Sequence, residues 1–204
     1  MNRRQWLTTF VSALAVLRWP RHAHAQDWTY VRAVESAFRE FAAATASRGR
    51  IAPVGEPGVP LVVRGTLFRA DGQTPLSGAL VFAYHTDRHG LYNPDEAAHS
   101  WRLRGAVRSA ADGSFEFRTI RPASYPQTRI PQHIHVALET PDGNYHAGEW
   151  RFADDTMIDQ TERSASDRAG EFGWVRPVRV NGAVHTIEVK TKVNPDQAFR
   201  VTAE

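Results

Sequence analysis

Residues 133–152 read HIHVALETPDGNYHAGEWRF, a stretch with the pattern of two β-strands joined by a turn. Two strand-like runs, 133–139 and 145–152, flank Asp142-Gly143, a dipeptide typical of turns. Further strand-like runs extend along the chain on both sides, near 61–68, 79–85, 104–109, 114–119, 174–180 and 183–192. Many short strands separated by Asp-Gly and Asn-Gly turns predict an all-β fold, an antiparallel β-sandwich.

An amphipathic segment precedes these strands. Apolar side chains recur at helix-like spacing from Asp27 to Ser47, and Arg48-Gly49 marks the expected end of a helix. A Pro/Gly-rich connector follows at 53–60. We therefore expect an N-terminal helix and connector, residues 26–59, followed by the β-sandwich domain, residues 60–204.

The first 25 residues have the pattern of an export signal. Residues 2–7 read NRRQWL, an apolar stretch runs to Leu17, and Ala23-His24-Ala25 is a small-x-small cleavage pattern. The apolar stretch is far shorter than the ~20 residues needed to cross a bilayer, so we expect no stable membrane anchor. We predict a twin-arginine signal peptide and a periplasmic protein. An accidental arginine pair in an ordinary secretory signal is the alternative.

Charge and cysteine content restrict the expected partners. Four of the 25 basic residues lie in the signal, which leaves 21 against 22 acidic residues, so the basic pI does not indicate nucleic acid binding. The chain has no cysteine. An exported protein without disulfides depends on its core or on association, and a homo-oligomer stays open.

The first strand of the quoted stretch carries a candidate metal site. Alternate side chains of a strand project to opposite faces, so His133 and His135 point to one side and two imidazoles converge. Tyr92 and Tyr125 lie earlier, in turn-rich segments. A phenol has a pKa of about 10, so a tyrosinate ligand requires a strongly Lewis-acidic centre. Zinc sites usually use Cys, His and carboxylate, and the chain has neither cysteine nor a carboxylate beside the histidine pair. The four side chains predict one Fe(III) ion.

The order of these motifs resembles a known family. Four segments carry the resemblance: VFAYHTDRHGLY (81–92), LRG (103–105), ADGSFEFRTIRPASY (111–125) and PQHIH (131–135). Together they are similar to the intradiol ring-cleavage dioxygenases, such as protocatechuate 3,4-dioxygenase and catechol 1,2-dioxygenase. The similarity runs from about Pro60 to Phe152, and its order and spacing are far more specific than a lone His-x-His pair.

The resemblance implies a function and a set of roles. In that family two tyrosines and two histidines bind a mononuclear non-haem Fe(III), and the matching residues are Tyr92, Tyr125, His133 and His135. A catechol-like substrate binds the iron and displaces the tyrosinate that matches Tyr125, which then helps take up a substrate proton. The bound catecholate reacts with O2, and cleavage between the hydroxylated carbons gives a muconate-type diacid.

The chain departs from the family pattern at two positions. The family usually has an arginine where this chain has Ile130, so the resemblance does not say what replaces that arginine. Arg129 lies one residue earlier, and it reaches the site only if a bulge shifts the local register. A glutamine that commonly follows in the next strand corresponds to Glu149.

Other readings of the sequence compete with this one. Residues 73–81 and 112–117 also look like transthyretin-like and carboxypeptidase-regulatory β-sandwiches, which are binding modules without catalysis. The acidic stretch 153–173 matches no Ca²⁺-loop spacing, so we expect a solvated loop or short helix there. His85 and His89 lie close to Tyr92 in the sequence. Three roles stay open for them: lining the entrance to the substrate site, donating hydrogen bonds to the metal ligands, or packing in the core.

Overall fold

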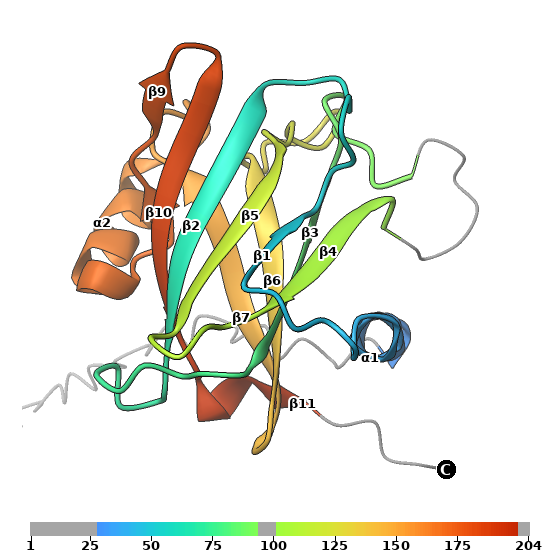
Figure 1. Ribbon diagram of the computed structural model, residues 1–204. Coiled ribbons are helices and arrows are strands. Elements are labelled where there is room, and N and C mark those ends of the chain that lie inside the picture. The colour runs from blue at the N-terminus through green and yellow to red at the C-terminus, as the bar shows by residue number, and fades with distance from the viewer. Residues whose placement is uncertain (1–27, 94–100, 200–204) are drawn as a thin grey trace, which may run out of the picture.

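The computed structural model describes residues 28–93 and 101–199, in which two β-sheets pack face to face (Figure 1). One sheet has the order β1 (Arg48–Arg50), β5 (Ser114–Ile120), β2 (Pro60–Phe68), β10 (Val184–Lys192) and β9 (Arg179–Asn181). The other has the order β11 (Ala198–Phe199), β7 (Gly143–Phe152), β6 (His133–Thr140), β3 (Leu80–His85) and β4 (Leu103–Arg108), with β8 (Val175–Arg176) paired to β7. The predicted β-sandwich is confirmed. The predicted signal peptide, residues 1–25, lies outside the described residues.

The main core lies between the two sheets. Inward-facing side chains come from both sheets and are fully buried, among them Val63, Phe117, Ile134 and Ile187. Burying a side chain of this size contributes about 1.5–3 kcal/mol relative to leaving it exposed. Because Ile134 is fixed in this core, the alternation of β6 turns its neighbours His133 and His135 to the outer face.

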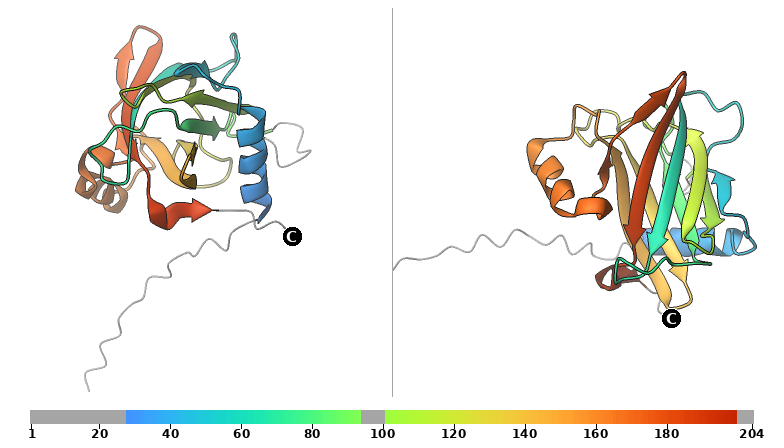
Figure 2. Two further views of the ribbon diagram at one scale, coloured as in Figure 1. Left: turned by 60° about the horizontal axis from the view of Figure 1, so that its bottom comes forward. Right: turned by 60° about the vertical axis from the view of Figure 1, so that its left-hand side comes forward.

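A second apolar cluster covers the outer face of the six-stranded sheet. Helix α1 (Trp28–Glu40) packs Val31, Val34 and Phe38 against Phe82 and Tyr84 of β3. Strand β3 is therefore buried on both faces. Figure 2 shows α1 and the second helix, α2 (Gln160–Arg168), on opposite sides of the sandwich.

The N-terminal helix is shorter than the sequence predicts. It begins as expected but ends at Glu40, and residues 48–50 form strand β1, which pairs parallel to β5. Two sets of contacts hold the segment after Glu40 out of a helix, although its apolar residues have helix-like spacing. The Arg108 side chain donates to the carbonyl oxygens of Ala42 and Ala44 at 3.0 and 2.8 Å, and the strand satisfies the backbone of the β5 edge.

Strand pairing differs from a purely antiparallel sandwich, because the pairs β1–β5, β2–β10 and β7–β8 are parallel. Strand β10 runs parallel to β2 over eight paired positions, from His185 with Leu61 to Lys192 with Phe68. The strand expected at 174–180 is split, because β8 joins one sheet and β9 joins the other. Pro177 lies at the crossing, and proline cannot donate a ladder hydrogen bond.

The acidic stretch folds as the sequence predicts, into loops and a short helix. Asp159 caps α2 by accepting from the backbone N–H of Glu162 at 2.8 Å, and Asp155 accepts from the backbone N–H of Gln132 at 2.7 Å. Asp154 forms a bidentate pair with Arg121. Within residues 28–93 and 101–199, no helix has the length and apolarity required to span a membrane.

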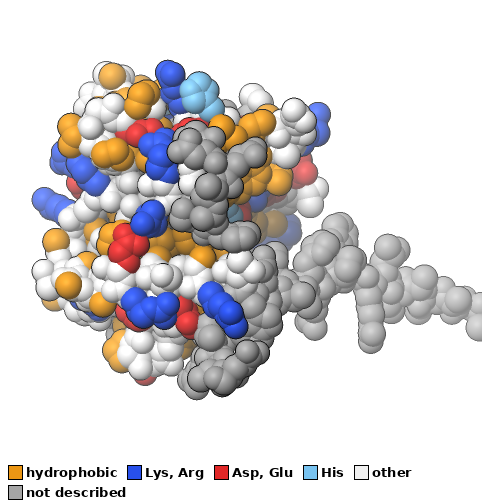
Figure 3. Space-filling view, turned by 90° about the vertical axis from the view of Figure 1, so that its right-hand side faces the viewer, with side chains coloured by type: hydrophobic (Ala, Val, Ile, Leu, Met, Phe, Trp, Pro, Cys, Tyr) orange, Lys and Arg blue, Asp and Glu red, His pale blue; other side chains and the backbone are white. Residues whose placement is uncertain are grey.

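Charged side chains of both signs are interspersed on the face on the side of β4 and α1, which Figure 3 shows. Several are paired, for example Arg104 with Glu40 and Arg102 with Glu56. On the part of this face where Figure 3 draws described residues, no single sign of charge predominates. The expectation that nucleic acid is not a partner stays a prediction.

Candidate metal centre

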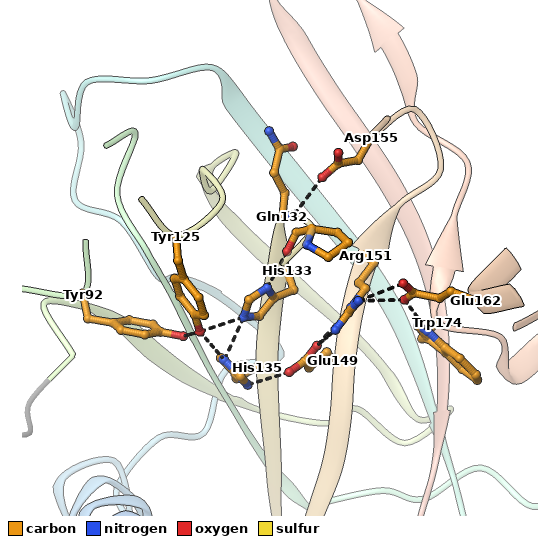
Figure 4. A network of polar contacts seen from close by, with 11 residues as sticks. Tyr92, Tyr125, Gln132, His133, His135, Glu149, Arg151, Asp155, Glu162 and Trp174 are labelled. Atoms are coloured by element: carbon orange, nitrogen blue, oxygen red, sulfur yellow. Dashed lines mark hydrogen bonds and ion pairs between the residues drawn. The ribbon is translucent and has the colours of Figure 1, made fainter. Parts of the chain in front are cut away.

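Four side chains from three segments converge on one point (Figure 4). The Tyr125 hydroxyl lies 2.9 Å from Nε2 of His133 and 3.2 Å from Nε2 of His135, and the two Nε2 atoms are 3.0 Å apart. The Tyr92 hydroxyl contacts that of Tyr125. Neighbouring ligands of one ion with bonds of about 2.1 Å are themselves about 3.0–3.4 Å apart, for bond angles between 90° and the tetrahedral angle. The structure thus brings together all four residues that the sequence singled out.

Each imidazole is anchored through its outer nitrogen. Nδ1 of His133 lies 2.7 Å from the carbonyl oxygen of Pro131, and Nδ1 of His135 lies 3.3 Å from Oε1 of Glu149. Because a carbonyl or carboxylate oxygen only accepts, the proton of each ring belongs on Nδ1. Both Nε2 atoms therefore present a lone pair to the shared point.

Burial sets the protonation states of these groups. Desolvation lowers the pKa of His135 to about 4, so its ring is neutral near pH 7. Burial raises the pKa of Tyr92 above its usual value, and the hydrogen bond to Tyr125 raises it further. Burial also raises the pKa of Tyr125. Both phenols are thus protonated without a cation, and only a strongly Lewis-acidic ion turns them into phenolates.

The two loops that carry Tyr92 and Tyr125 are joined by hydrogen bonds and by a close backbone contact. The Thr86 hydroxyl donates to the carbonyl oxygen of Ala123 at 2.6 Å, and the Ala123 N–H donates to that of Asp87 at 3.1 Å. Gly90 has φ +82°, and a Cβ atom there would lie 2.1 Å from the carbonyl oxygen of Ser124. Glycine at this position lets the Tyr92 loop touch the residue that precedes Tyr125.

Aromatic stacking fixes the plane of one imidazole. The rings of Tyr84 and His135 are stacked with centroids 4.7 Å apart and an interplanar angle of 14°. Trp101 also stacks on Tyr84, with ring centroids 3.8 Å apart and an interplanar angle of 18°. No sequence pattern predicts the Tyr84–His135 contact, because it joins β3 and β6 across a pairing that only the folded sheet defines.

A carboxylate lies next to the histidine pair, contrary to the sequence analysis. Glu149 is paired with His135 across β6 and β7 and, with both histidines, forms a group of potential metal ligands. Arg151 donates to Oε2 of Glu149 at 2.7 and 3.0 Å and to both carboxylate oxygens of Glu162 at 2.8 and 2.9 Å. The two-residue spacing of Glu149 and Arg151 on a strand is the signal that could have found this network.

The remaining candidates differ in burial, with Arg129 and Ile130 exposed and His85 buried. Arg129 is exposed, and it makes no ion pair with the part of the chain that the structure describes. Ile130 is 39% exposed. His85 is fully buried and lies 2.6 Å from both the Thr86 carbonyl and the Thr119 hydroxyl, so it packs inside and does not line a substrate mouth.

The fold is a β-sandwich, and its candidate site combines two tyrosines from loops with two histidines at the start of an inner strand. Residues 35–169 match the Dioxygenase (Dioxygenase_C) family model. The chain belongs to this family, the intradiol ring-cleavage dioxygenases. Membership counts against the alternative of a transthyretin-like binding module.

Individual relatives agree with the family match. Catechol 1,2-dioxygenase 1 from Acinetobacter lwoffii is 41% identical over 83 residues, which cover 38% of this chain and 26% of the relative. Chlorocatechol 1,2-dioxygenase from Rhodococcus opacus is 32% identical over 111 residues, covering 43% and 41%. The chain therefore matches well under half the length of these relatives.

Solved structures share the fold. The dioxygenase domain of a dioxygenase carbohydrate-binding protein fusion from Streptomyces sp. SirexAA-E is 26% identical, with a TM-score of 0.56, and the match covers 74% of this chain and 89% of that domain. Catechol 1,2-dioxygenase from Pseudomonas arvilla C-1 has a TM-score of 0.54 at 17% identity, over 85% of this chain and 72% of its own. The second likeness concerns the fold alone.

Proposed function

We propose that the protein is an intradiol dioxygenase that binds one Fe(III) ion through Tyr92, Tyr125, His133 and His135 and cleaves a catechol-type ring with O2 to a muconate-type diacid. The observation that carries the proposal is the convergence of two phenol oxygens and two lone-pair nitrogens on one point. Family membership and the names of the relatives support the reaction class.

The donor set fits a ferric ion. Phenolates are hard, anionic ligands, and two of them beside two neutral imidazoles suit a trivalent centre that displaces both phenol protons. The set offers no thiolate, the ligand that many zinc sites use. When bound, the ion supplies Lewis-acid activation of the catechol and brings it together with O2.

The chain's own residues supply orientation and a proton acceptor. His133 and His135 fix one side of the site because their outer nitrogens and ring planes are held. The Tyr92 ring packs against the cluster beneath α1, whereas Tyr125 is followed by the exposed residues 126–130. Tyr125 is thus the ligand that is freer to move aside, and its phenolate oxygen is placed to take a hydroxyl proton from the arriving catechol.

Ring cleavage with labelled oxygen tests the reaction. The iron-loaded protein is incubated with catechol, protocatechuate or hydroxyquinol under ¹⁸O2, and the products are identified by mass spectrometry. We expect a ring-opened diacid that carries both labelled atoms from at least one substrate. Iron-loaded protein that leaves all three catechols intact would refute the proposed activity.

We also propose that the protein is exported to the periplasm by the twin-arginine pathway, with residues 1–25 as the signal. Support comes from the Arg3-Arg4 pair and the short apolar stretch that follows it. This pathway exports folded proteins, so it would allow a metalloprotein to receive its iron before export.

A further inference from the structure

The two histidines of the candidate centre are supported by groups of different charge. His133 has a neutral carbonyl oxygen behind its ring, at 2.7 Å from Nδ1. His135 has the carboxylate of Glu149, whose Oε1 lies 3.3 Å from Nδ1. A carboxylate behind a metal-binding imidazole fixes the tautomer and raises the basicity of the ligand more than a carbonyl does.

A β-bulge in β7 brings this carboxylate to the site. His135 pairs with Glu149 but Ala137 pairs with His146, so β7 holds one extra residue at this point. Gly148 lies within the bulge and has φ +79°. Before the bulge Tyr145 faces the core, and after it Trp150 and Phe152 do. The change of parity turns Glu149 and Arg151 to the face that carries the histidines.

A chain of ion pairs holds Glu149 in place (Figure 4). Arg151 binds Oε2 of Glu149, which leaves Oε1 facing His135. The other side of the guanidinium is held by Glu162, which also accepts from Nε1 of Trp174 at 3.0 Å. All three charged side chains are 17–27% exposed, so the pairs are more persistent than pairs on an open surface.

Glu149 lies behind one of the proposed ligands and is not itself one of the four. Its nearer oxygen faces Nδ1 of His135, the nitrogen on the far side of the ring from the convergence point. Its other oxygen, Oε2, accepts from Arg151 at 2.7 and 3.0 Å. Glu149 is therefore an arginine-paired carboxylate placed behind a ligand.

We propose that Glu149 is a positioning residue of the metal centre, which holds His135 with Nε2 toward the ion and adds negative charge behind it, while Arg151 and Glu162 hold Glu149. The inference rests on the metal site of the proposed function. It assigns a role to the one position near the histidines where the chain has a carboxylate in place of the family's usual glutamine.

Ferric binding by Glu149 variants tests this role without any turnover. The metal-free wild type, Glu149→Gln, Glu149→Ala and a control are titrated with ferric nitrilotriacetate, and the tyrosinate absorption band is followed. The control is Glu188→Gln, because Glu188 also pairs with an arginine, Arg179, but lies exposed on the other sheet. Circular dichroism of the metal-free proteins establishes which variants are folded.

The variants have distinct expected results. Glu149→Ala loses about 10- to 100-fold in ferric affinity, the usual cost of removing such an outer partner. Glu149→Gln keeps a hydrogen-bond acceptor and most of the affinity, but its tyrosinate band moves to longer wavelength, because the ion loses a nearby negative charge and becomes a stronger acceptor. Glu188→Gln matches the wild type.

Two failures are distinguishable. If the wild type gives no tyrosinate band, the proposed metal site is wrong. If the wild type binds iron while Glu149→Ala keeps its affinity and Glu149→Gln keeps its band position, only the role of Glu149 is overturned. Should Glu149→Ala not fold, the band position in Glu149→Gln decides.

Discussion

The hydrogen-bond partners of each histidine ring determine whether that histidine can bind a metal ion. His133 and His135 use the same ring atom toward the metal because both Nδ1 atoms face acceptors. His85 has the same residue type and lies one residue beyond Tyr84, yet both of its ring nitrogens are taken by threonine groups inside the sandwich. A ligand histidine therefore differs from a core histidine in the hydrogen-bond partners of its ring nitrogens.

The buried His85 predicts a pH-dependent stability. Burial lowers the pKa of His85 to about 4, against about 6.5 in the unfolded chain. The unfolded state therefore binds more protons between these values, so the free energy of unfolding falls as the pH drops from about 6.5 toward 4. Between pH 7 and pH 5 we expect His85 to account for a loss of roughly 2 kcal/mol in the metal-free protein.

Urea unfolding at pH 7 and pH 5 measures this effect. In His85→Gln the loss between the two pH values should be smaller than in the wild type, although the variant is less stable at pH 7. Part of the loss remains, because His135 also has a lowered pKa. An equal loss in both proteins would show that His85 does not titrate as its burial requires.

The two tyrosines should respond differently to substrate. Tyr92 is packed beneath α1 and Tyr125 precedes an exposed segment, so we expect catechol to displace Tyr125. Resonance Raman spectra of iron-loaded variants distinguish tyrosinate from catecholate vibrations. In Tyr125→Phe the tyrosinate signal of Tyr92 should survive anaerobic catechol, whereas in Tyr92→Phe the signal should vanish. The opposite pattern would exchange the two roles.

Strands and loops share the task of building the site. Strand β6 contributes the histidines through its alternation, and the loops after β3 and β5 contribute the tyrosines. Their meeting depends on the close approach of Gly90 to Ser124. The Tyr92 loop is therefore predicted to tolerate no side chain at position 90.

Gly90→Ala tests this requirement against a matched control. Both Gly90 and Gly182 have positive φ, so alanine at either costs roughly 1–2 kcal/mol of backbone strain. Only at Gly90 does the added Cβ meet backbone, whereas at Gly182 it meets open space. We expect both variants to lose stability on urea unfolding and only Gly90→Ala to lose iron. Equal iron contents would contradict the proposed contact.

The predicted elements were right where apolar alternation is strong and wrong where tertiary contacts override it. Strands were predicted at 133–139 and 145–152 because their inward residues are apolar, and the structure has them at His133–Thr140 and Gly143–Phe152. Strand β1 was missed because Arg48-Gly49-Arg50 has no apolar residue and exists only through its pairing with β5. The parallel pairing of β2 with β10 could not be read from local pattern, which does not encode strand direction.

The sequence predicted the four candidate ligands but not the charged network behind them. His133 and His135 follow from strand alternation, and Tyr92 and Tyr125 from the family resemblance. The Glu149–Arg151–Glu162 network was missed because the bulge at Gly148 changes which residues of β7 share a face. The two-residue spacing of Glu149 and Arg151 indicates that they share a face of the strand, but no periodic signal shows that an inserted residue turns this face toward the histidines.

Export of the whole molecule gives a prediction that does not depend on the site. Substituting both Arg3 and Arg4 by lysine should keep the precursor in the cytoplasm, because the twin-arginine pathway requires the arginine pair. Fractionation of cells that express the wild type or the double variant measures this. Export of the double variant would instead favour an ordinary secretory signal.

The proposed iron site is best tested by the visible absorption spectrum of the iron-replete protein, recorded before and after catechol is added without oxygen. A tyrosinate-to-Fe(III) band requires Tyr92 or Tyr125 on the ion, and a shift with catechol requires the substrate to enter the same coordination sphere. We predict a broad band that shifts when catechol binds. A colourless protein whose spectrum does not change with catechol would contradict the account.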